Sequence, residues 1–255
     1  MTRLSQLLTL PLPAELDSVQ QKSPVVYSLS LLPDDGNPFG GPQLSLLESR
    51  SLLAASGTTG LRTWEASIHL GQYLCVNPFL VRNKRILELG TGTGYLSILC
   101  AKLLGATHVL ASDGSSDVIN NLPASLATNG LQQSPSIMPL ELTWGQPIPD
   151  PKDQAWSGSH SIDLVLGADI TYDPDVIPSL ITTICDLVRA FPDVYIVIAA
   201  TERNRETFQS FKIACQDSDF VVNTIQFPLP SRQQQAGPFY NDQVPIHICS
   251  LKKGA

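Results

Sequence analysis

The chain has 255 residues, which is enough for one large α/β domain and too few for two of ordinary size. Apolar residues make up 43% of the chain, so a sizeable core can be buried, and this argues against global disorder. The net charge is −7 and no long run of Lys or Arg is present, so we expect no direct contact with nucleic acid.

The cysteines and the N-terminus indicate the cellular compartment. Five cysteines are widely spaced, without a CxxC pair or a Cys/His cluster, so we expect free thiols in a reducing environment and no metal site. Residues 1–17 carry one Arg, and Pro11 and Pro13 interrupt their short apolar run, which makes a poor signal peptide. No stretch approaches the roughly 18 apolar residues of a membrane span. We therefore expect a cytoplasmic, monomeric protein without membrane contact.

The chain is expected to divide into an N-terminal extension, residues 1–43, and one domain, residues 44–255. The extension is partly irregular and rich in Pro, Gly, Ser and Asn, with a strand-like run at 25–32 and a loop at 37–42. In the domain, apolar residues at helical spacing predict a first helix that begins near Thr63.

After Pro78 the chain alternates between apolar strands and amphipathic helices. Strands are predicted at 85–89, 108–113, 138–144, 162–169, 194–200, 220–227 and 244–251. Helices are predicted at 95–105, at 118–130, in a segment that Asp173, Pro174 and Asp175 open, and around residues 208–215. The last two strands are joined by a long polar loop and are expected to close the sheet as an antiparallel pair. This alternation predicts an α/β fold with a doubly wound, mostly parallel sheet and one reversed strand.

A glycine-rich turn follows the strand at 85–89 and opens the next helix. Gly90, Gly92 and Gly94 let the backbone turn sharply and approach a ligand closely, and the helix that follows presents free N–H groups. Asp113 comes nineteen residues after Gly94 and ends the next strand, where a carboxylate can accept both hydroxyls of a ribose. The alternative is a structural turn without any ligand.

Two details of the turn argue against a dinucleotide. The fingerprint G-x-G-x-x-G is not met, because Tyr95 stands three residues after Gly92. Glu88 is expected to point its charge at the turn, which is awkward beside a pyrophosphate and sensible beside a cationic amino acid. S-adenosylmethionine carries a ribose, an ammonium and a sulfonium, and no phosphate. It is therefore the ligand we expect.

Four motifs carry a resemblance to a known family. ELGTGTG (88–94) with Asp113 resembles the cofactor motif of the seven-strand, Rossmann-like methyltransferases that use S-adenosylmethionine. SGTTGLRTWEASIHLGQYL (56–74), ELTWG (141–145) and GADITYD (167–173) resemble the protein-lysine methyltransferases of that fold, and most of all the branch that acts on translation elongation factor 2. The match covers residues 44–250. Members of that branch usually carry a longer N-terminal region, so we expect a shortened form here.

The resemblance implies a protein-lysine N-methyltransferase whose protein substrate is elongation factor 2. The cofactor contacts that it implies fall on Trp64, Gly90, Thr91, Gly92, Asp113, Trp144 and Ala168. Trp144 is expected to flank the adenine, since an aromatic face and a nearby backbone N–H are both useful there. For both tryptophans the alternative is a structural role, and for Trp64 this means a core anchor on its helix.

Asp169 and Tyr172 lie at the carboxyl end of the fourth predicted strand, the edge over which ligands bind in open α/β sheets. They resemble the family's Asp-x-x-Tyr signature, which makes them the predicted catalytic residues. We expect Asp169 to bind and direct the incoming lysine ammonium, and Tyr172 to line the pocket and orient the nitrogen. Desolvation lowers the pKa of the amine whereas Asp169 alone would raise it, so Asp169 is expected to orient rather than act as a strong base. The alternative is a helix N-cap and a rim aromatic.

Two further functions and two further features stay open at this point. A small-molecule methyltransferase would share the fold and the cofactor site, and a non-catalytic cofactor-binding partner protein would share both as well. Arg203 is expected at a solvated helix start after the fifth strand, and the alternative is that it helps to shape the substrate side. Phe239 and Tyr240, in the late polar loop, are expected either to form a substrate lip or to pack the loop.

Overall fold

Apolar side chains alternate along the central strands, so these strands build one sheet with a core on each face. In strand β3 (Arg85–Leu89), Ile86 packs in one core, whereas Leu87 and Leu89 pack in the other. The structure of the protein is a computed structural model, and it describes residues 22–34, 36, 41–49, 59–150, 153, 156 and 161–254.

The sheet has seven strands, which confirms the predicted α/β, doubly wound fold with one reversed strand. In spatial order they are β5 (Ile137–Glu141), β4 (His108–Asp113), β3, β6 (Leu164–Ala168), β7 (Tyr195–Thr201), β9 (Ile246–Lys253) and β8 (Phe220–Ile225). Only β9 is reversed, and it lies between β7 and β8 and pairs antiparallel with both. The chain order of the sheet changes direction between β3 and β6, and such a switch point is where open α/β sheets bind ligands.

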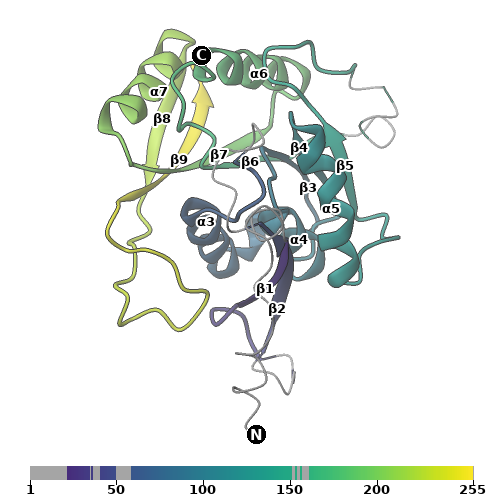
Figure 1. Cartoon of the computed structure of the whole chain (residues 1–255). Helices are drawn as coiled ribbons and strands as arrows, with labels where there is room; N and C mark the ends of the chain where they lie inside the picture. Colours follow the sequence, from purple (N-terminus) through teal and green to yellow (C-terminus); the bar gives the residue numbers. More distant parts are fainter. Residues whose placement is uncertain are drawn as a thin grey trace, which may run out of the picture.

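Helices cover both faces of the sheet. The core around Ile86 takes side chains from α3 (Glu65–Val76), α4 (Tyr95–Lys102) and α5 (Ser116–Thr128). The opposite core takes side chains from α6 (Ile177–Ala190) and α7 (Arg205–Asp217). Figure 1 shows α6 and α7 at the top of the view and α3 and α4 below the sheet. A short 3₁₀ helix, η1 (Pro78–Leu80), follows α3.

Two N-terminal strands form a separate antiparallel hairpin against α4 and α5. β1 (Ser23–Ser28) pairs with β2 (Gln43–Glu48), and Leu44 and Leu46 are buried in the core of the α3 face. The predicted strand at 25–32 ends earlier because a turn follows Ser28, in which the N–H of Leu32 donates to the carbonyl of Leu29. β2 was not predicted. The hairpin straddles the expected boundary between residues 43 and 44, which stays a prediction.

Other element boundaries differ from the expectation by a few residues. β5 ends at Glu141, after which the N–H of Leu142 bonds to the carbonyl of Asp113 and the chain leaves the sheet. α5 begins at Ser116 and continues through Pro123. Most of the expected loop at 37–42, the first residues of the motif at 56–74 and much of the loop at 145–160 lie outside the described residues. In that last loop, however, Trp156 is described and fully buried against Phe191.

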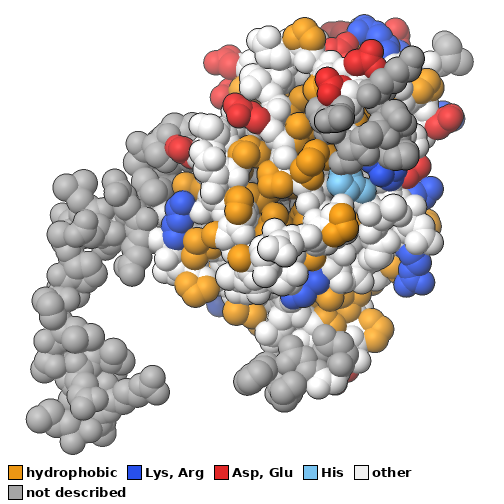
Figure 2. Space-filling view, turned by 90° about the vertical axis from the view of Figure 1, so that its right-hand side faces the viewer, with side chains coloured by type: hydrophobic (Ala, Val, Ile, Leu, Met, Phe, Trp, Pro, Cys, Tyr) orange, Lys and Arg blue, Asp and Glu red, His pale blue; other side chains and the backbone are white. Residues whose placement is uncertain are grey.

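The surface and the side-chain inventory add little to the question of function. Figure 2 faces the β5 edge, where hydrophobic side chains gather across the middle and the Lys and Arg side chains are scattered. No described helix has the length and apolar character needed to cross a membrane. Within the described ranges, no three His, Cys, Asp or Glu side chains come together as metal ligands. All five cysteines are free thiols.

Candidate active site

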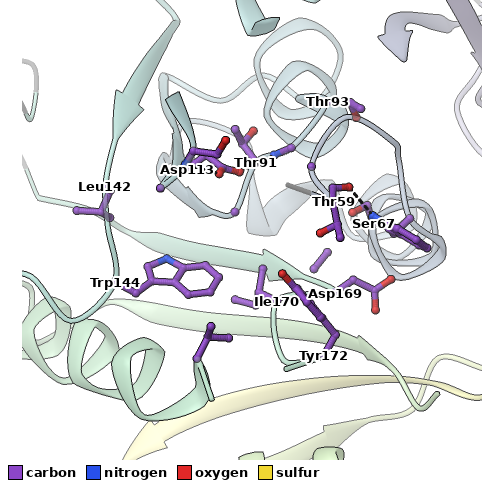
Figure 3. Close-up of a pocket in the computed structure, with 18 of the residues that line it drawn as sticks. Thr59, Ser67, Thr91, Thr93, Asp113, Leu142, Trp144, Asp169, Ile170 and Tyr172 are labelled. Atoms are coloured by element: carbon purple, nitrogen blue, oxygen red, sulfur yellow. Dashed lines mark hydrogen bonds between the residues drawn. The ribbon is translucent and has the colours of Figure 1, made fainter. Parts of the chain in front are cut away.

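A pocket of about 580 Å³ opens at the carboxyl ends of β3, β4 and β6. All nine residues that the sequence singled out for catalysis or cofactor binding line it: Trp64, Gly90, Thr91, Gly92, Asp113, Trp144, Ala168, Asp169 and Tyr172. Figure 3 shows Asp113 and Trp144 at one end of this pocket and Asp169 and Tyr172 at the other. The pocket therefore brings together residues from five separate stretches of the chain.

The glycine turn forms one wall of the pocket. Gly90 and Gly92 have positive φ angles of 68° and 54°, a region that favours glycine. A Cβ atom on Gly90 would lie 2.7 Å from Cγ2 of Ile170, and one on Gly92 would lie 3.0 Å from the carbonyl oxygen of Gly60. Both conformation and space therefore require glycine, and the backbone of the turn stays open to a ligand.

Glu88 lies beneath the turn, and the interpretation that its charge meets a cationic ligand is wrong. Its side chain is buried, and Oε2 accepts hydrogen bonds from Thr91 Oγ1 at 2.8 Å, from the N–H of Ser97 at 3.0 Å and from the Ser97 hydroxyl. Burial raises the pKa of Glu88 to about 7, although the bonds from Ser97 and Thr91 oppose the rise. Glu88 ties the turn to the first residues of α4 and does not line the pocket among the described residues.

Asp113 also holds the turn, and its carboxylate lines the pocket. Oδ2 accepts from the N–H of Gly92 at 3.2 Å, and Oδ1 accepts from the N–H of Ser115 at 3.0 Å. Burial raises the pKa of Asp113, and the backbone donors at Ser115 and Gly92 work in the opposite direction. A carboxylate oxygen accepts more than one hydrogen bond, so each oxygen keeps capacity for a ligand hydroxyl.

Trp144 lies across the turn from Asp113. An added Cβ on Gly90 would lie 3.4 Å from Cζ2 of its indole ring, so the ring closes the space above that glycine. The indole Nε1 is buried and has no hydrogen-bond partner among the described residues. An indole N–H is a donor only, and leaving it unsatisfied costs roughly 1–3 kcal/mol. A ligand with an acceptor in this part of the pocket would remove that cost.

Asp169 is buried and fully engaged by the protein. It has a positive φ of 54°, which turns the chain sharply at the end of β6. Its carboxylate accepts from the N–H of Thr201 at 2.9 Å, from Thr201 Oγ1 at 2.9 Å and from the N–H of Ala66 at 3.3 Å. Ala66 lies in the first turn of α3, whose N-cap residue Trp64 makes no side-chain cap. Asp169 therefore caps α3, which lies about a hundred residues earlier in the chain, and not the helix that follows it.

Arg203 forms an ion pair with Asp169. The expectation of a solvated helix start did not include this contact. Its Nη1 lies 3.2 Å from Asp169 Oδ1, and its Nη2 lies 2.8 Å from Glu65 Oε2. Its guanidinium carbon lies over the Trp64 ring, 4.8 Å from the centroid, and Arg62 lies over the same ring at 4.8 Å. One sequence signal could have found this residue. It follows β7, and β7 pairs with β6, so its position is next to Asp169 at the same sheet edge.

Tyr172 stands at the mouth of the pocket. Its side chain is 54% exposed, whereas Ile170 and Thr171 before it are buried. Figure 3 shows its ring between Trp144 and Asp169, in front of Ile170.

The two tryptophans differ in their surroundings. Trp64 is half-buried, and its Nε1 donates to the carbonyl of Thr59 at 3.0 Å.

Phe239 and Tyr240, in the polar loop between β8 and β9, have different surroundings. Tyr240 is buried and packs the loop, since its hydroxyl donates to Gln72 Oε1 at 2.7 Å and lies 2.8 Å from Nδ1 of His69. Burial lowers the pKa of His69 to about 4, so its ring is neutral near pH 7. Phe239 is 69% exposed and lines a second cavity of about 400 Å³, which shares Arg62 and Thr63 with the first.

Comparisons with known proteins agree with this geometry. Residues 49–216 match the family described as Lysine methyltransferase. The chain is 54% identical to the protein-lysine N-methyltransferase EFM3 of Chaetomium thermophilum, over 99% of this chain and 74% of that protein. It is 31% identical to the human protein-lysine N-methyltransferase EEF2KMT, over 68% of this chain and only 54% of that protein. Among solved structures, an S-adenosylmethionine-dependent O-methyltransferase of Thermotoga maritima covers 85% of this chain and 80% of its own, with a TM-score of 0.53 and 12% identity, and shows the fold alone.

Proposed function

The chain belongs to the lysine methyltransferase family, and from this premise we propose that it transfers methyl groups from S-adenosylmethionine to a lysine of translation elongation factor 2. The observation that carries the proposal is the single pocket lined by all nine predicted residues. The choice of elongation factor 2 is supported by the motif resemblance and by the similarity to the relative named EEF2KMT. We further propose that the protein acts as a monomer in the cytoplasm.

The pocket residues fit S-adenosylmethionine better than a dinucleotide. Among the described lining residues, Asp113, Asp169 and Asp175 are acidic and Arg62 alone is basic, which suits a cation rather than a pyrophosphate. The Asp113 carboxylate would hold the ribose hydroxyls, and the Trp144 ring would flank the adenine. The indole N–H of Trp144, which has no partner among the described residues, would donate to an acceptor on the ligand. The open backbone of Gly90 to Gly92 would lie along the rest of the molecule. When bound, S-adenosylmethionine supplies an electrophilic methyl group on its sulfonium.

The residues at the other end of the pocket would prepare the lysine. A lysine ammonium has a pKa of about 10.4 in water, so almost none is nucleophilic at neutral pH. Burial in the pocket beside Tyr172 would remove water from the amine and lower its pKa. Asp169 and Tyr172 would fix the direction of the nitrogen, and the exposed position of Tyr172 leaves a path for the proton to water. The rate gain would come mostly from holding the reacting atoms in line.

A transfer experiment tests the proposal. The protein is incubated with radiolabelled S-adenosylmethionine and a cell lysate, and the labelled protein is identified and digested to find the modified residue. We expect label on a lysine of elongation factor 2. Label in the small-molecule fraction alone would instead support a small-molecule methyltransferase. Cofactor binding without any transfer would support the non-catalytic alternative.

The Asp169→Asn and Tyr172→Phe variants sharpen this test. Both changes keep the size of the side chain, so cofactor affinity measured by calorimetry should stay close to that of the wild type while transfer falls. Because Asp169 also caps α3, the Asn variant must first be shown to be folded by circular dichroism. Full transfer by both folded variants would contradict the assignment of these residues.

A further inference from the structure

The Asp169 carboxylate, which is expected to meet the lysine ammonium, already faces a cation of its own chain. Arg203 Nη1 lies 3.2 Å from Asp169 Oδ1, and Nη2 lies 3.4 Å from Oδ2, so both oxygens are engaged. The Asp169 side chain is only 5% exposed, whereas that of Arg203 is 38% exposed. The site therefore presents a carboxylate and guanidinium pair to the substrate, not a free negative charge.

We propose that Arg203 is a positioning residue that neutralises Asp169, so that the site directs the lysine amine without holding it in its protonated form. An unpaired carboxylate within about 4–6 Å of an ammonium raises the pKa of that ammonium by roughly 1–3 units. Such a rise would work against methyl transfer, because only the neutral amine has a lone pair to attack. The Arg203 charge cancels this effect, so the paired Asp169 forms part of the pocket wall beside the amine without adding a net negative charge there. The inference rests on the proposed lysine methylation.

Arg203 is held from three sides, so it stays in place when a second cation arrives. The guanidinium bonds to Asp169, to Glu65 Oε2 at 2.8 Å, and lies 4.8 Å from the Trp64 ring centroid. A planar guanidinium with five N–H donors suits such a shared arrangement, whereas a lysine ammonium is a compact point charge. Asp169 itself is fixed by Thr201 and by the first turn of α3.

Other charged and titratable groups also face this corner, and their charges largely cancel. Glu65 comes from the start of α3, and Arg62, just before it, lies 3.6 Å from Glu65 Oε1. Asp175 and the Tyr172 phenol come from the segment before α6 and line the same pocket. Arg62 gives a matched control, because it shares the Trp64 ring and Glu65 with Arg203. No hydrogen bond joins it to Asp169 within the described part of the chain.

The pH profile of kcat tests the inference, because kcat reports groups in the bound complex whereas kcat/KM reports the free enzyme and free substrate. Initial rates are measured with purified elongation factor 2 at saturating substrate, from about pH 6.5 to about pH 10. For Arg203→Gln we expect the midpoint of kcat to move up by about one pH unit, with roughly tenfold slower transfer near pH 7 and recovery at high pH. Arg203→Lys, which keeps a charge, and Arg62→Gln should keep the midpoint near that of the wild type.

The results separate failure of the inference from failure of the proposed function. An Arg203→Gln midpoint equal to that of the wild type, or a lower rate without recovery at high pH, overturns the inference, as does faster transfer at neutral pH. Tyr172→Phe is measured in parallel to identify any part that the phenol contributes to the profile. If the wild type itself transfers no methyl group to the protein, the proposed function fails, and this outcome is distinct from an unchanged midpoint in an active enzyme.

Discussion

The buried carboxylate of Glu88 makes the stability of the protein depend on pH. Its pKa is raised from 4.5 to about 7, mainly by burial, so the folded state prefers the protonated form. Because the unfolded chain releases this proton at lower pH, the contribution of Glu88 to stability is full below about pH 4.5 and is lost as the pH rises through 7. A difference of about 2.5 pKa units corresponds to about 3 kcal/mol.

The Glu88→Gln substitution isolates this effect. Three donors, from Thr91 and Ser97, converge on Oε2 alone, so a glutamine carbonyl oxygen can accept the same bonds without a titrating proton. We expect the free energy of unfolding of the wild type, relative to the variant, to fall by about 3 kcal/mol between about pH 4.5 and about pH 8. The assay is urea unfolding followed by fluorescence at closely spaced pH values.

Comparing two proteins at each pH removes the contribution of all other titrating groups that both share. A difference in unfolding free energy that stays constant over this range would refute the reasoning. It would mean either that Glu88 is accessible to water or that its three donors offset burial completely. The same variant should still bind the cofactor, since Glu88 does not line the pocket among the described residues.

Three other predictions concern stability. Gly90→Ala places a Cβ within 2.7 Å of Ile170 at a φ of 68°. The unfolding free energy should therefore fall by at least about 1 kcal/mol, and cofactor affinity in calorimetry should weaken. Unchanged values would contradict the close packing. The unfolding free energy of the wild type, relative to that of His69→Gln, should fall by about 3 kcal/mol as the pH falls from 6.5 to about 4, because the histidine of the unfolded chain takes up its proton first. A difference in urea unfolding that does not change with pH would contradict this prediction. Trp156→Ala should cost about 3–5 kcal/mol in urea unfolding, whereas Phe79→Ala, at an exposed position, should cost less than about 0.5 kcal/mol, and equal losses would count against the buried position of Trp156.

Several pocket residues could be predicted because their motifs follow strands, whereas Trp64, at the start of α3, was implied by the family resemblance. The turn after β3, Asp113 at the end of β4 and Asp169 after β6 must meet at one edge when these strands are parallel. That rule needs no knowledge of side-chain packing. The fold class followed for the same reason, since alternating strands and helices leave few ways to bury both faces of a sheet.

The ion pair between Arg203 and Asp169 could not be read from local sequence. Thirty-four positions separate the two residues, and the polar run around Arg203 is also typical of a solvated helix start. The same holds for Glu88, whose burial depends on how α4 begins. The sequence showed a charged residue near a ligand turn, whereas the structure turns that charge inward to Thr91 and Ser97.

Two misses in the fold have different causes. β2 has the alternating pattern of a half-buried strand, but its inward positions include Glu48, whose carboxylate accepts from Tyr27 at 2.6 Å and Thr63 at 2.8 Å. A buried glutamate looks like a solvent position until its partners are known. Trp156 stands in a polar, proline-rich loop without periodicity, and its burial depends on Phe191 at the end of α6.

The most direct test of the account is isothermal titration of the wild-type protein with S-adenosylmethionine, set against NAD. We predict saturable binding of one S-adenosylmethionine per chain, no comparable heat with NAD, and binding at least about tenfold weaker in Asp113→Ala, where hydrogen bonds to a charged group are lost. Folded wild-type protein that takes up no S-adenosylmethionine, or that binds NAD as tightly, would contradict the central claim.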